Sequence, residues 1–272
     1  MKSKELALAA VLAVALVAAT LALPAVVDAR PAFAVPVHED EGEGTYRDPA
    51  SGDWSEAPAA TLEMASAPSG LPNASSTTVE EAKLQAVRTD ERLFLKLSWA
   101  DATNDTETGD VGAFADAAAI QLPVDESARP PIAMGGADNP VNVWFWRADA
   151  TQQELLAGGA GTTTPMNGTV ATESRYVDGQ REVVFSRDLD ASGANRTSVP
   201  ADEDLDVAIA VWNGSADERS GHKAASDWYY LALGAGPQGP PYELLLWVIA
   251  GLAIVFTTLV TIEGVRRTRG DS

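Results

Sequence analysis

Two side chains with uncommon electron-pair donors stand out in the sequence. Lysine occurs only five times in 272 residues, and Lys223 lies late in the chain, within DERSGHKAASDWYYLAL at 217–233. Met134 lies between a proline-rich approach and two glycines in RPPIAMGGADNP. A thioether on a rigid loop can be presented to a metal or a flat cofactor, whereas an arbitrary methionine more often fills a gap in a core. From the residues alone, both interpretations stay open.

Other catalytic chemistry has few residues to use. Histidine occurs only at His38 and His222, so no Ser–His–Asp arrangement, zinc cluster or glycine-rich phosphate loop can be assembled. Paired carboxylates such as Asp125 and Glu126 are frequent because the chain is acidic, and they indicate solvated surface. The absence of cysteine excludes disulfides, zinc–thiolate and iron–sulfur sites, and a covalently attached c-type haem.

The composition describes an acidic domain with a substantial core. The chain has 39 Asp and Glu against 19 Lys and Arg, which gives a net charge of -20. Such a lysine-poor, acidic surface is typical of a halophilic protein adapted to very high salt, and it disfavours contact with nucleic acid. A hydrophobic content of 46% and seven tryptophans exclude an acidic disordered chain.

The first residues predict export from the cytoplasm. Lys2 and Lys4 precede an apolar run from about residue 6 to residue 27, and AFA at 32–34 is a small-residue cleavage site. We therefore expect residues 1–34 to be a signal peptide or, if uncleaved, an N-terminal anchor. The mixed acidic, glycine and proline residues at 35–60 are expected to form an acidic linker that is mobile or only partly ordered.

The last residues predict a membrane span. The uncharged run at 244–262 is long enough to cross a hydrocarbon core of about 30 Å as a helix. A spacer at 236–243 precedes it, and the arginine-rich tail at 263–272 is expected on the cytoplasmic side. These features predict a cell-membrane protein, single-pass by its C-terminal helix, with an extracellular main domain. Five glycosylation patterns agree with that topology: Asn73, Asn104, Asn167, Asn195 and Asn213.

Between the ends, hydrophobicity alternates with a period of two. The predicted strands cover 82–87 and 93–99 as a hairpin, 116–124, 141–149, a second hairpin within 168–189 that turns at Asp-Gly, and 205–214. Because no convincing amphipathic helix separates them, these strands indicate a mainly β protein with an antiparallel β-sandwich over 61–235.

Several segments together resemble the haem b (gamma) subunit of the type II dimethyl sulfoxide reductase family. That family includes the gamma subunits of ethylbenzene dehydrogenase, dimethylsulfide dehydrogenase, selenate reductase and chlorate reductase. The similarity spans about residues 75–235 and rests on LKLSWAD, FADAAAIQLPV, PPIAMGGADNPVNVWFWRAD and DVAIAVWNGSADERSGHKAASDWYYLAL. The resemblance implies a DOMON-like β-sandwich that holds one haem b between a methionine and a lysine.

Transferred residue by residue, the resemblance makes Met134 and Lys223 the axial ligands of the haem iron. A lysine must lose its proton before it binds iron, and burial favours that loss, whereas arginine stays protonated. His222 is kept as a substitute ligand, although neighbours on a strand point to opposite faces. Arg147 and Arg219 are candidates to bind the haem propionates.

The function that the resemblance implies is electron relay, because a six-coordinate haem passes electrons and leaves bond-making to another subunit. The expected partners are a molybdopterin-containing catalytic subunit, nitrate reductase-like in a salt-adapted cell, and an iron–sulfur subunit. A quinol-oxidising cytochrome or a copper protein would connect the relay to the respiratory chain. The C-terminal span departs from the soluble gamma subunits. The alternative is a haem-free surface module that binds carbohydrate or another ligand, in which Met134 and Lys223 are packing and surface residues.

Overall fold

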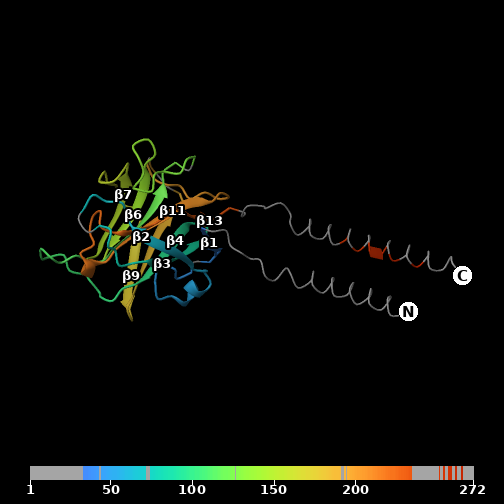
Figure 1. Cartoon of the computed structure of the whole chain (residues 1–272), viewed down its shortest axis with the longest axis horizontal. Helices are drawn as coiled ribbons and strands as arrows, with labels where there is room; N and C mark the ends of the chain where they lie inside the picture. Colours follow the sequence, from blue (N-terminus) through green and yellow to red (C-terminus); the bar gives the residue numbers. More distant parts are fainter. Residues whose placement is uncertain are drawn as a thin grey trace. The chain divides into compact units, whose positions relative to one another are not determined.

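The computed structural model describes residues 33–42, 44–71, 74–125, 127–190, 193 and 195–234, and six residues between 251 and 265. Strands are the main regular elements of the unit Ala32–Gly236 (Figure 1). The six described residues of the other unit are helical. Within the described parts of the chain, no helix is both long and apolar enough to span a membrane. The segments predicted as signal or anchor, 1–34, and as membrane span, 244–262, lie almost wholly outside the described residues.

The strand-rich unit contains thirteen strands and two short 3-10 helices. The strands are β1 (Ala34–Glu39), β2 (Ala60–Ser66), β3 (Glu81–Arg88), β4 (Arg92–Ala100), β5 (Ala117–Pro123), β6 (Val141–Arg147), β7 (Thr151–Ala157), β8 (Thr164–Pro165), β9 (Ala171–Val177), β10 (Gln180–Asp188), β11 (Leu205–Trp212), β12 (Ala224–Ser226) and β13 (Tyr229–Ala232). The 3-10 helices are η2 (Gly52–Ser55) and η3 (Gly214–Ala216).

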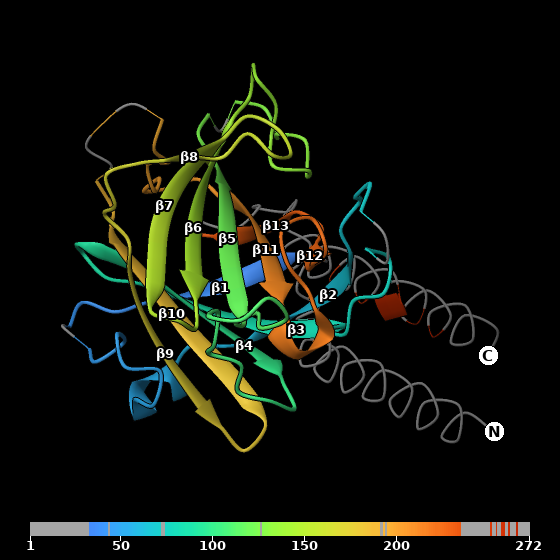
Figure 2. The same cartoon turned by 90° about the vertical axis from the view of Figure 1, so that its left-hand side faces the viewer.

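Antiparallel pairing connects the strands in the order β8-β7-β6-β5-β11-β12-β2-β3-β4-β10-β9. This path turns back on itself, so that β5, β6, β7 and β11 form one layer and β3, β4, β9 and β10 form a second (Figure 2). The predicted mainly antiparallel β architecture is confirmed. The exception is β1, which pairs in parallel with both β13 and β3.

Alternating side chains explain why these segments form strands. The predicted hairpins correspond to β3–β4 and β9–β10, and the strands predicted over 116–124, 141–149 and 205–214 correspond to β5, β6 and β11. The inward side chains of both layers form one core, in which the rings of Trp99 and Trp146 meet edge to face at 6.5 Å. Each fully buried large aliphatic side chain in such a core stabilises the fold by about 1.5–3 kcal/mol.

The acidic segment 35–60 is not the mobile linker that its composition predicted. It contains β1 and η2, and Trp54 on η2 is only 3% exposed. Trp54 packs edge to face on Tyr46, which also contacts Phe94 of β4. The expectation was wrong because two aromatic side chains bury enough apolar surface to dock a segment that is otherwise acidic and rich in glycine and proline.

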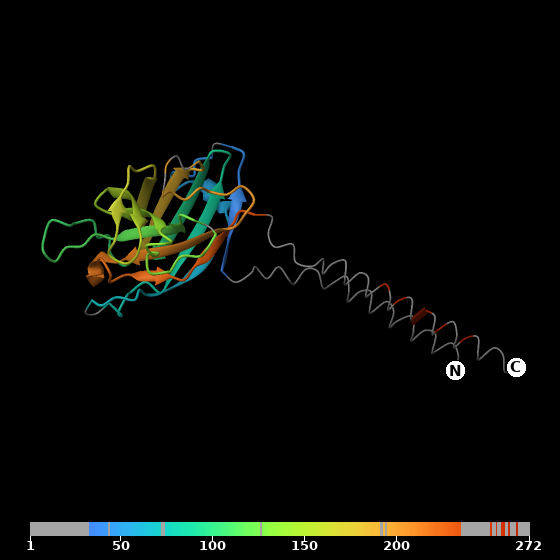
Figure 3. The same cartoon turned by 90° about the horizontal axis from the view of Figure 1, so that it is seen from above.

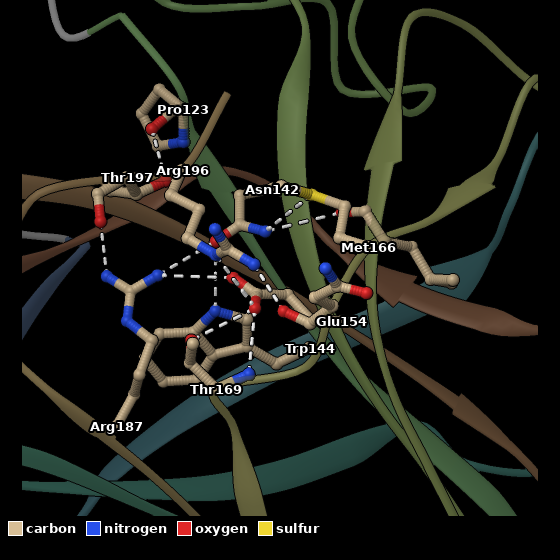
Figure 4. Close-up of polar contacts among 11 residues, drawn as sticks. Pro123, Asn142, Trp144, Glu154, Met166, Thr169, Arg187, Arg196 and Thr197 are labelled. Atoms are coloured by element: carbon tan, nitrogen blue, oxygen red, sulfur yellow. Dashed lines mark hydrogen bonds and ion pairs between the residues drawn. The ribbon is translucent and has the colours of Figure 1, made fainter. Parts of the chain in front are cut away.

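A charged pair lies between the layers. Arg187 of β10 is 1% exposed, and its Nη1 lies 3.5 Å from Oε1 of the fully buried Glu154 of β7. Figure 4 shows that the same guanidinium donates to Asn142 Oδ1 at 3.0 Å. It also lies over the ring of Trp144, 4.8 Å from the ring centroid. The pair therefore joins the two layers through the interior.

Glu154 receives several further hydrogen bonds. Its Oε2 accepts from Arg196 Nε at 3.1 Å, from the Thr169 amide at 3.1 Å and from the Thr169 hydroxyl at 3.0 Å. Burial by itself raises the pKa of Glu154, but the bonds from Arg196 and Thr169 outweigh it and leave the pKa below the usual value. Glu154 is therefore the anion that compensates the buried Arg187.

Replacing Glu154 with glutamine is expected to lower the free energy of unfolding by about 3–5 kcal/mol, because it leaves the buried Arg187 without a counter-charge. Denaturant-induced unfolding at constant salt measures the change. The matched control is Asp188→Asn, which removes the exposed partner of Arg92 and should change stability by at most about 1 kcal/mol. Equal effects of the two substitutions would contradict a structural role for the buried pair.

Candidate functional site

The fold brings Lys223 and Met134 together. Met134 lies in the loop between β5 and β6, and Lys223 lies immediately before β12, 89 positions later. Lys223 Nζ lies 3.8 Å from Met134 Sδ. The contact is on the face of the β5–β6–β11 layer that points away from the other layer, where Met134 packs on a second hydrophobic cluster.

Small side chains form the surface beside this contact. We call Ala117 and Ala119 of β5 and Ala208 and Ala210 of β11 the alanine floor, since they share the outward face of adjacent strands. Ala119 is directly opposite Ala210, and Trp212 is opposite Ala117. Methyl groups leave room for a flat group to approach the sheet. The alternate residues of the same strands belong to the interlayer core: Ala118, Ile120, Val207, Ile209 and Val211.

Two tryptophans hold the segments that carry the contact. Trp228 Nε1 donates to the carbonyl of Pro130 at 3.0 Å, on the approach to Met134. Trp212 Nε1 donates to the carbonyl of Ser220 at 3.1 Å, on the approach to Lys223. Both rings belong to the outward cluster, so the same aromatic side chains line the site and fix the two loops.

The Met134 loop has a constrained backbone. Met134 has φ +66° and Gly135 has φ +70°, both in the left-handed region. For a residue with a side chain this conformation costs roughly 1–3 kcal/mol, and such strain is often found at ligand clamps. The turn persists because the Met134 amide donates to the Ile132 carbonyl, and the Met134 carbonyl accepts from Gly159, each at 2.8 Å. The thioether is therefore held in position by its backbone.

Lys223 is half-buried and lacks the usual partner of a desolvated cation. Among the described residues, no carboxylate forms an ion pair with it, although Nζ lies 5.1 Å from the centroid of the Trp212 ring. Burial lowers the pKa of the Lys223 ammonium group. The site therefore favours the neutral amine, whose lone pair can bind a metal.

His222 faces a different part of the fold from Lys223. Its Nε2 lies 3.3 Å from the Ser76 carbonyl oxygen, and its side chain is buried. This arrangement agrees with the opposite orientation expected for neighbouring residues on an extended chain. The contact that involves Met134 is made by Lys223 and not by His222.

The two arginines predicted for propionates differ in their surroundings. Arg147 is paired across the sheet with Ala117 of the alanine floor, and its Nη2 donates to Asp149 at 2.7 Å. This hydrogen bond raises the pKa of Arg147, and the opposing effect of burial is smaller. Arg219 is exposed and lies over the ring of Phe114 at 4.1 Å. Both roles stay predictions.

The alanine floor was missed in the sequence, although a signal for it is present. In AAAIQL and VAIAV, alanines occupy alternate positions on one face, while most positions on the other face hold larger apolar residues. Alternation of two apolar sizes is a weaker pattern than alternation of apolar and polar residues, and it marks a strand that is covered on both faces.

Comparison with known proteins identifies the family of this chain. A family model described as ethylbenzene dehydrogenase matches residues 51–168 and 159–224. The chain belongs to the ethylbenzene dehydrogenase family. The matched residues include Met134, Lys223 and both strands of the alanine floor. The family resemblance predicted from the sequence is therefore confirmed.

Three relatives are subunits of respiratory or redox enzymes by name. "Putative respiratory nitrate reductase heme subunit ORF7" of Haloferax mediterranei is 51% identical over 99% of this chain and 98% of its own length. The chlorate reductase subunit gamma of Ideonella dechloratans is 34% identical over 69% of this chain and 80% of its own. The dimethylsulfide dehydrogenase subunit gamma of Rhodovulum sulfidophilum is 32% identical over 70% and 76%.

A solved structure gives a weaker match. The carbohydrate binding module family 9 of Caldicellulosiruptor kristjanssonii, in complex with glucose, is 10% identical with a TM-score of 0.47. The match covers 76% of this chain and all of the module. This similarity is too low to indicate which ligand the chain binds.

Replacing Gly135 with alanine is expected to destabilise the Met134 loop by at least about 1 kcal/mol, because the residue has positive φ and its Cβ would lie 2.8 Å from the Asn139 carbonyl oxygen. Thermal or denaturant unfolding measures the loss. Gly136→Ala is the matched control: its Cβ meets only Pro131, at 3.8 Å, so its effect should stay within about 0.5 kcal/mol. A Gly135→Ala protein as stable as wild type would contradict the constraint.

Proposed function

We propose that this chain is a membrane-anchored, extracytoplasmic b-type cytochrome subunit that relays electrons between a molybdenum/iron–sulfur oxidoreductase and the respiratory chain. The observation that carries the proposal is the contact of 3.8 Å between Lys223 Nζ and Met134 Sδ. A desolvated amine and a thioether are both donors of electron pairs, and neither is a good hydrogen-bond partner for the other. Their convergence is better explained by a metal that binds both.

The two donor atoms come from separate loops and meet at one place. Lys223 Nζ and Met134 Sδ lie 3.8 Å apart, so both could bind the same iron. Met134 and Lys223 are thus the residues that would hold the iron from opposite sides.

The surroundings of the pair suit a flat, non-covalent macrocycle. The alanine floor and the rings of Trp212 and Trp228 form an apolar surface beside the two ligands. The chain has no cysteine, so a haem in this protein is not attached by thioether bonds, and haem b is the type that fits. When bound, the haem supplies one-electron transfer. With both Met134 and Lys223 holding the iron, the haem would pass electrons and leave bond-making to another subunit.

The names of the relatives support the proposed partners. A heme subunit assigned to respiratory nitrate reductase aligns with this chain from end to end, and two gamma subunits of other oxidoreductases align with about 70% of it. We take the partners to be a molybdopterin-containing catalytic subunit, nitrate reductase-like, and an iron–sulfur subunit. A quinol-oxidising cytochrome or a copper protein would exchange electrons with the haem at the membrane.

The apolar run at 244–262 supports the proposed anchor. It contains no charged residue, and three arginines follow it within the next seven positions, which favours a cytoplasmic C-terminus. The alignment with the Haloferax mediterranei relative spans 271 residues and so takes in this segment. A tether keeps the haem close to the membrane and raises its effective concentration toward membrane-bound partners.

Absorption spectroscopy of the full chain, produced with sufficient haem and purified in detergent, tests the assignment. The wild type is expected to show a Soret band and a six-coordinate, low-spin spectrum. Lys223→Ala and Met134→Ala each remove one axial ligand and should give a high-spin spectrum or lower the haem affinity at least about tenfold. Lys83→Ala is the matched control, since Lys83 is an exposed lysine on β3 and its loss should leave the spectrum unchanged.

Three outcomes would contradict the proposal. Unchanged low-spin spectra in both Lys223→Ala and Met134→Ala would show that other residues bind the iron. A low-spin spectrum in Lys223→Ala that is lost on adding His222→Ala would identify His222 as the ligand. A colourless wild-type protein would favour the surface module that binds carbohydrate or another ligand.

A further inference from the structure

Three carboxylates meet at the base of the loop between β4 and β5. Asp101 follows β4, Asp116 precedes β5, and Asp105 lies between them in the chain. Each offers one oxygen, and these oxygens all lie within 4.8 Å of one another. Asp101 is 3% exposed and Asp116 is fully buried. We call these three residues the carboxylate cluster; the loop above it projects from the layers (Figure 3).

The hydrogen-bonding capacity of Asp116 is well used within the protein. Its Oδ1 accepts from the Gly214 amide at 3.0 Å. Its Oδ2 accepts from Arg181 Nη2 at 2.7 Å and from the Asp105 amide at 3.1 Å. Arg181 also donates to Asn104 Oδ1. This single guanidinium offsets one of the three negative charges and leaves two without compensation.

The carboxylate of Asp101 indicates that the carboxylate cluster lacks a cationic partner. Its Oδ1 accepts from the Thr103 amide at 3.1 Å, but its Oδ2 is buried and has no hydrogen-bond partner within the described part of the chain. Burial, and next the charge of Asp116, raise the pKa of Asp101 to about 6. Leaving a buried carboxylate oxygen unpartnered is unfavourable, so such an oxygen points toward an absent cationic partner.

We propose that Asp101, Asp105 and Asp116 bind one divalent cation, and that the cation is Ca²⁺. Ca²⁺ binds carboxylate oxygens at about 2.3–2.6 Å, so opposite ligands are roughly 5 Å apart and three oxygens within 4.8 Å of one another can share one ion. Its two positive charges match the two uncompensated negative charges. Mg²⁺ demands nearly ideal octahedral geometry and gives up water reluctantly, so it fits an irregular protein site less well.

The ion has a route from solvent and room for further ligands. Asp105 and Asn104 line an open hollow that is also bordered by Glu107 and Asp217. Water in this hollow can complete the six to eight ligands that Ca²⁺ takes. Asp101 and Asp116 form the closed side of the same site, because both are buried.

The position of the cluster gives the ion a structural role. Asp101 belongs to the end of β4 in one layer, whereas Asp116 precedes β5 in the other layer and bonds to Gly214, just after β11. The adjacent row of the sheet contains Ala117 and Trp212. Ca²⁺ would therefore fasten the two layers together at the end of the alanine floor.

Calcium binding to the full chain tests this inference independently of haem. The protein is treated with EDTA, freed of chelator and titrated with CaCl₂ by equilibrium dialysis in molar NaCl, which screens diffuse binding to the acidic surface. One saturable site per chain is expected, with MgCl₂ a weaker competitor. Asp101→Asn and Asp105→Asn should each weaken Ca²⁺ binding at least tenfold. The control Asp125→Asn, an exposed carboxylate outside the cluster, should bind as wild type does.

Thermal unfolding provides a second measurement. CaCl₂ should raise the melting temperature of wild type and of Asp125→Asn, and it should do so much less for the two cluster variants, because only a bound ion stabilises the folded state. Asp105 is only partly buried, so Asp105→Asn decides the matter if Asp101→Asn does not fold. The absence of a saturable site in wild type, or wild-type affinity in Asp105→Asn, would overturn the proposal.

Discussion

A half-buried amine, with no carboxylate paired to it among the described residues, is the constraint around which the site is arranged. The chain carries 39 acidic residues, so a lysine that needs a carboxylate can readily find one. Lys96 shows the usual solution: its Nζ lies 3.6 Å from Glu182 and donates to the Pro49 carbonyl. Lys223 instead has a thioether and an indole ring beside it. Desolvation acts on both lysines and lowers the pKa of each, but only at Lys96 does a nearby carboxylate oppose that change.

The layer that carries the site has different chemistry on its two faces. Toward the other layer, β6 and β7 contribute to a polar network in which Glu154 and Asn142 hold Arg187. Toward the outside, the middle of β5 and β11 presents the alanine floor and the ring of Trp212. The inner face thus resists sliding of the layers, because a shift would break several buried hydrogen bonds at once. A rigid layer in turn keeps the loops that carry Met134 and Lys223 at a fixed separation.

The sequence predicted local features better than distant ones. Alternation located β3, β4, β5, β6, β9, β10 and β11, because side chains of period two are visible in any short window. It did not reveal β7, where the segment TQQELLA lacks that alternation, or the parallel pairing of β1, which joins distant parts of the chain. The acidic segment at 35–60 was misjudged because composition outweighed two aromatic residues.

The sequence predicted the Met134–Lys223 pair but not the carboxylate cluster. Met134 and Lys223 came from the family resemblance, since neither residue type alone distinguishes a ligand from a core or surface side chain. Their contact depends on two loops that meet only after β11 and β12 have paired, and no sequence window contains both. The sequence did not predict the carboxylate cluster because acidic residues are common throughout the chain. In a chain this rich in aspartate, three more acidic residues give no signal until burial separates them from the solvated ones.

The parallel pairing of β1 has a consequence for maturation. The small-residue motif at 32–34 ends on Ala34, the first residue of β1, which pairs with Tyr230 of β13. The Phe33 carbonyl already accepts a hydrogen bond from the Tyr230 amide. A peptidase acts on backbone that is open and not on paired strands. If the expected signal peptide is removed at this motif, its cleavage would have to precede the pairing of β13, which is synthesised almost 200 residues later. At roughly 5–20 residues per second, that delay is on the order of tens of seconds.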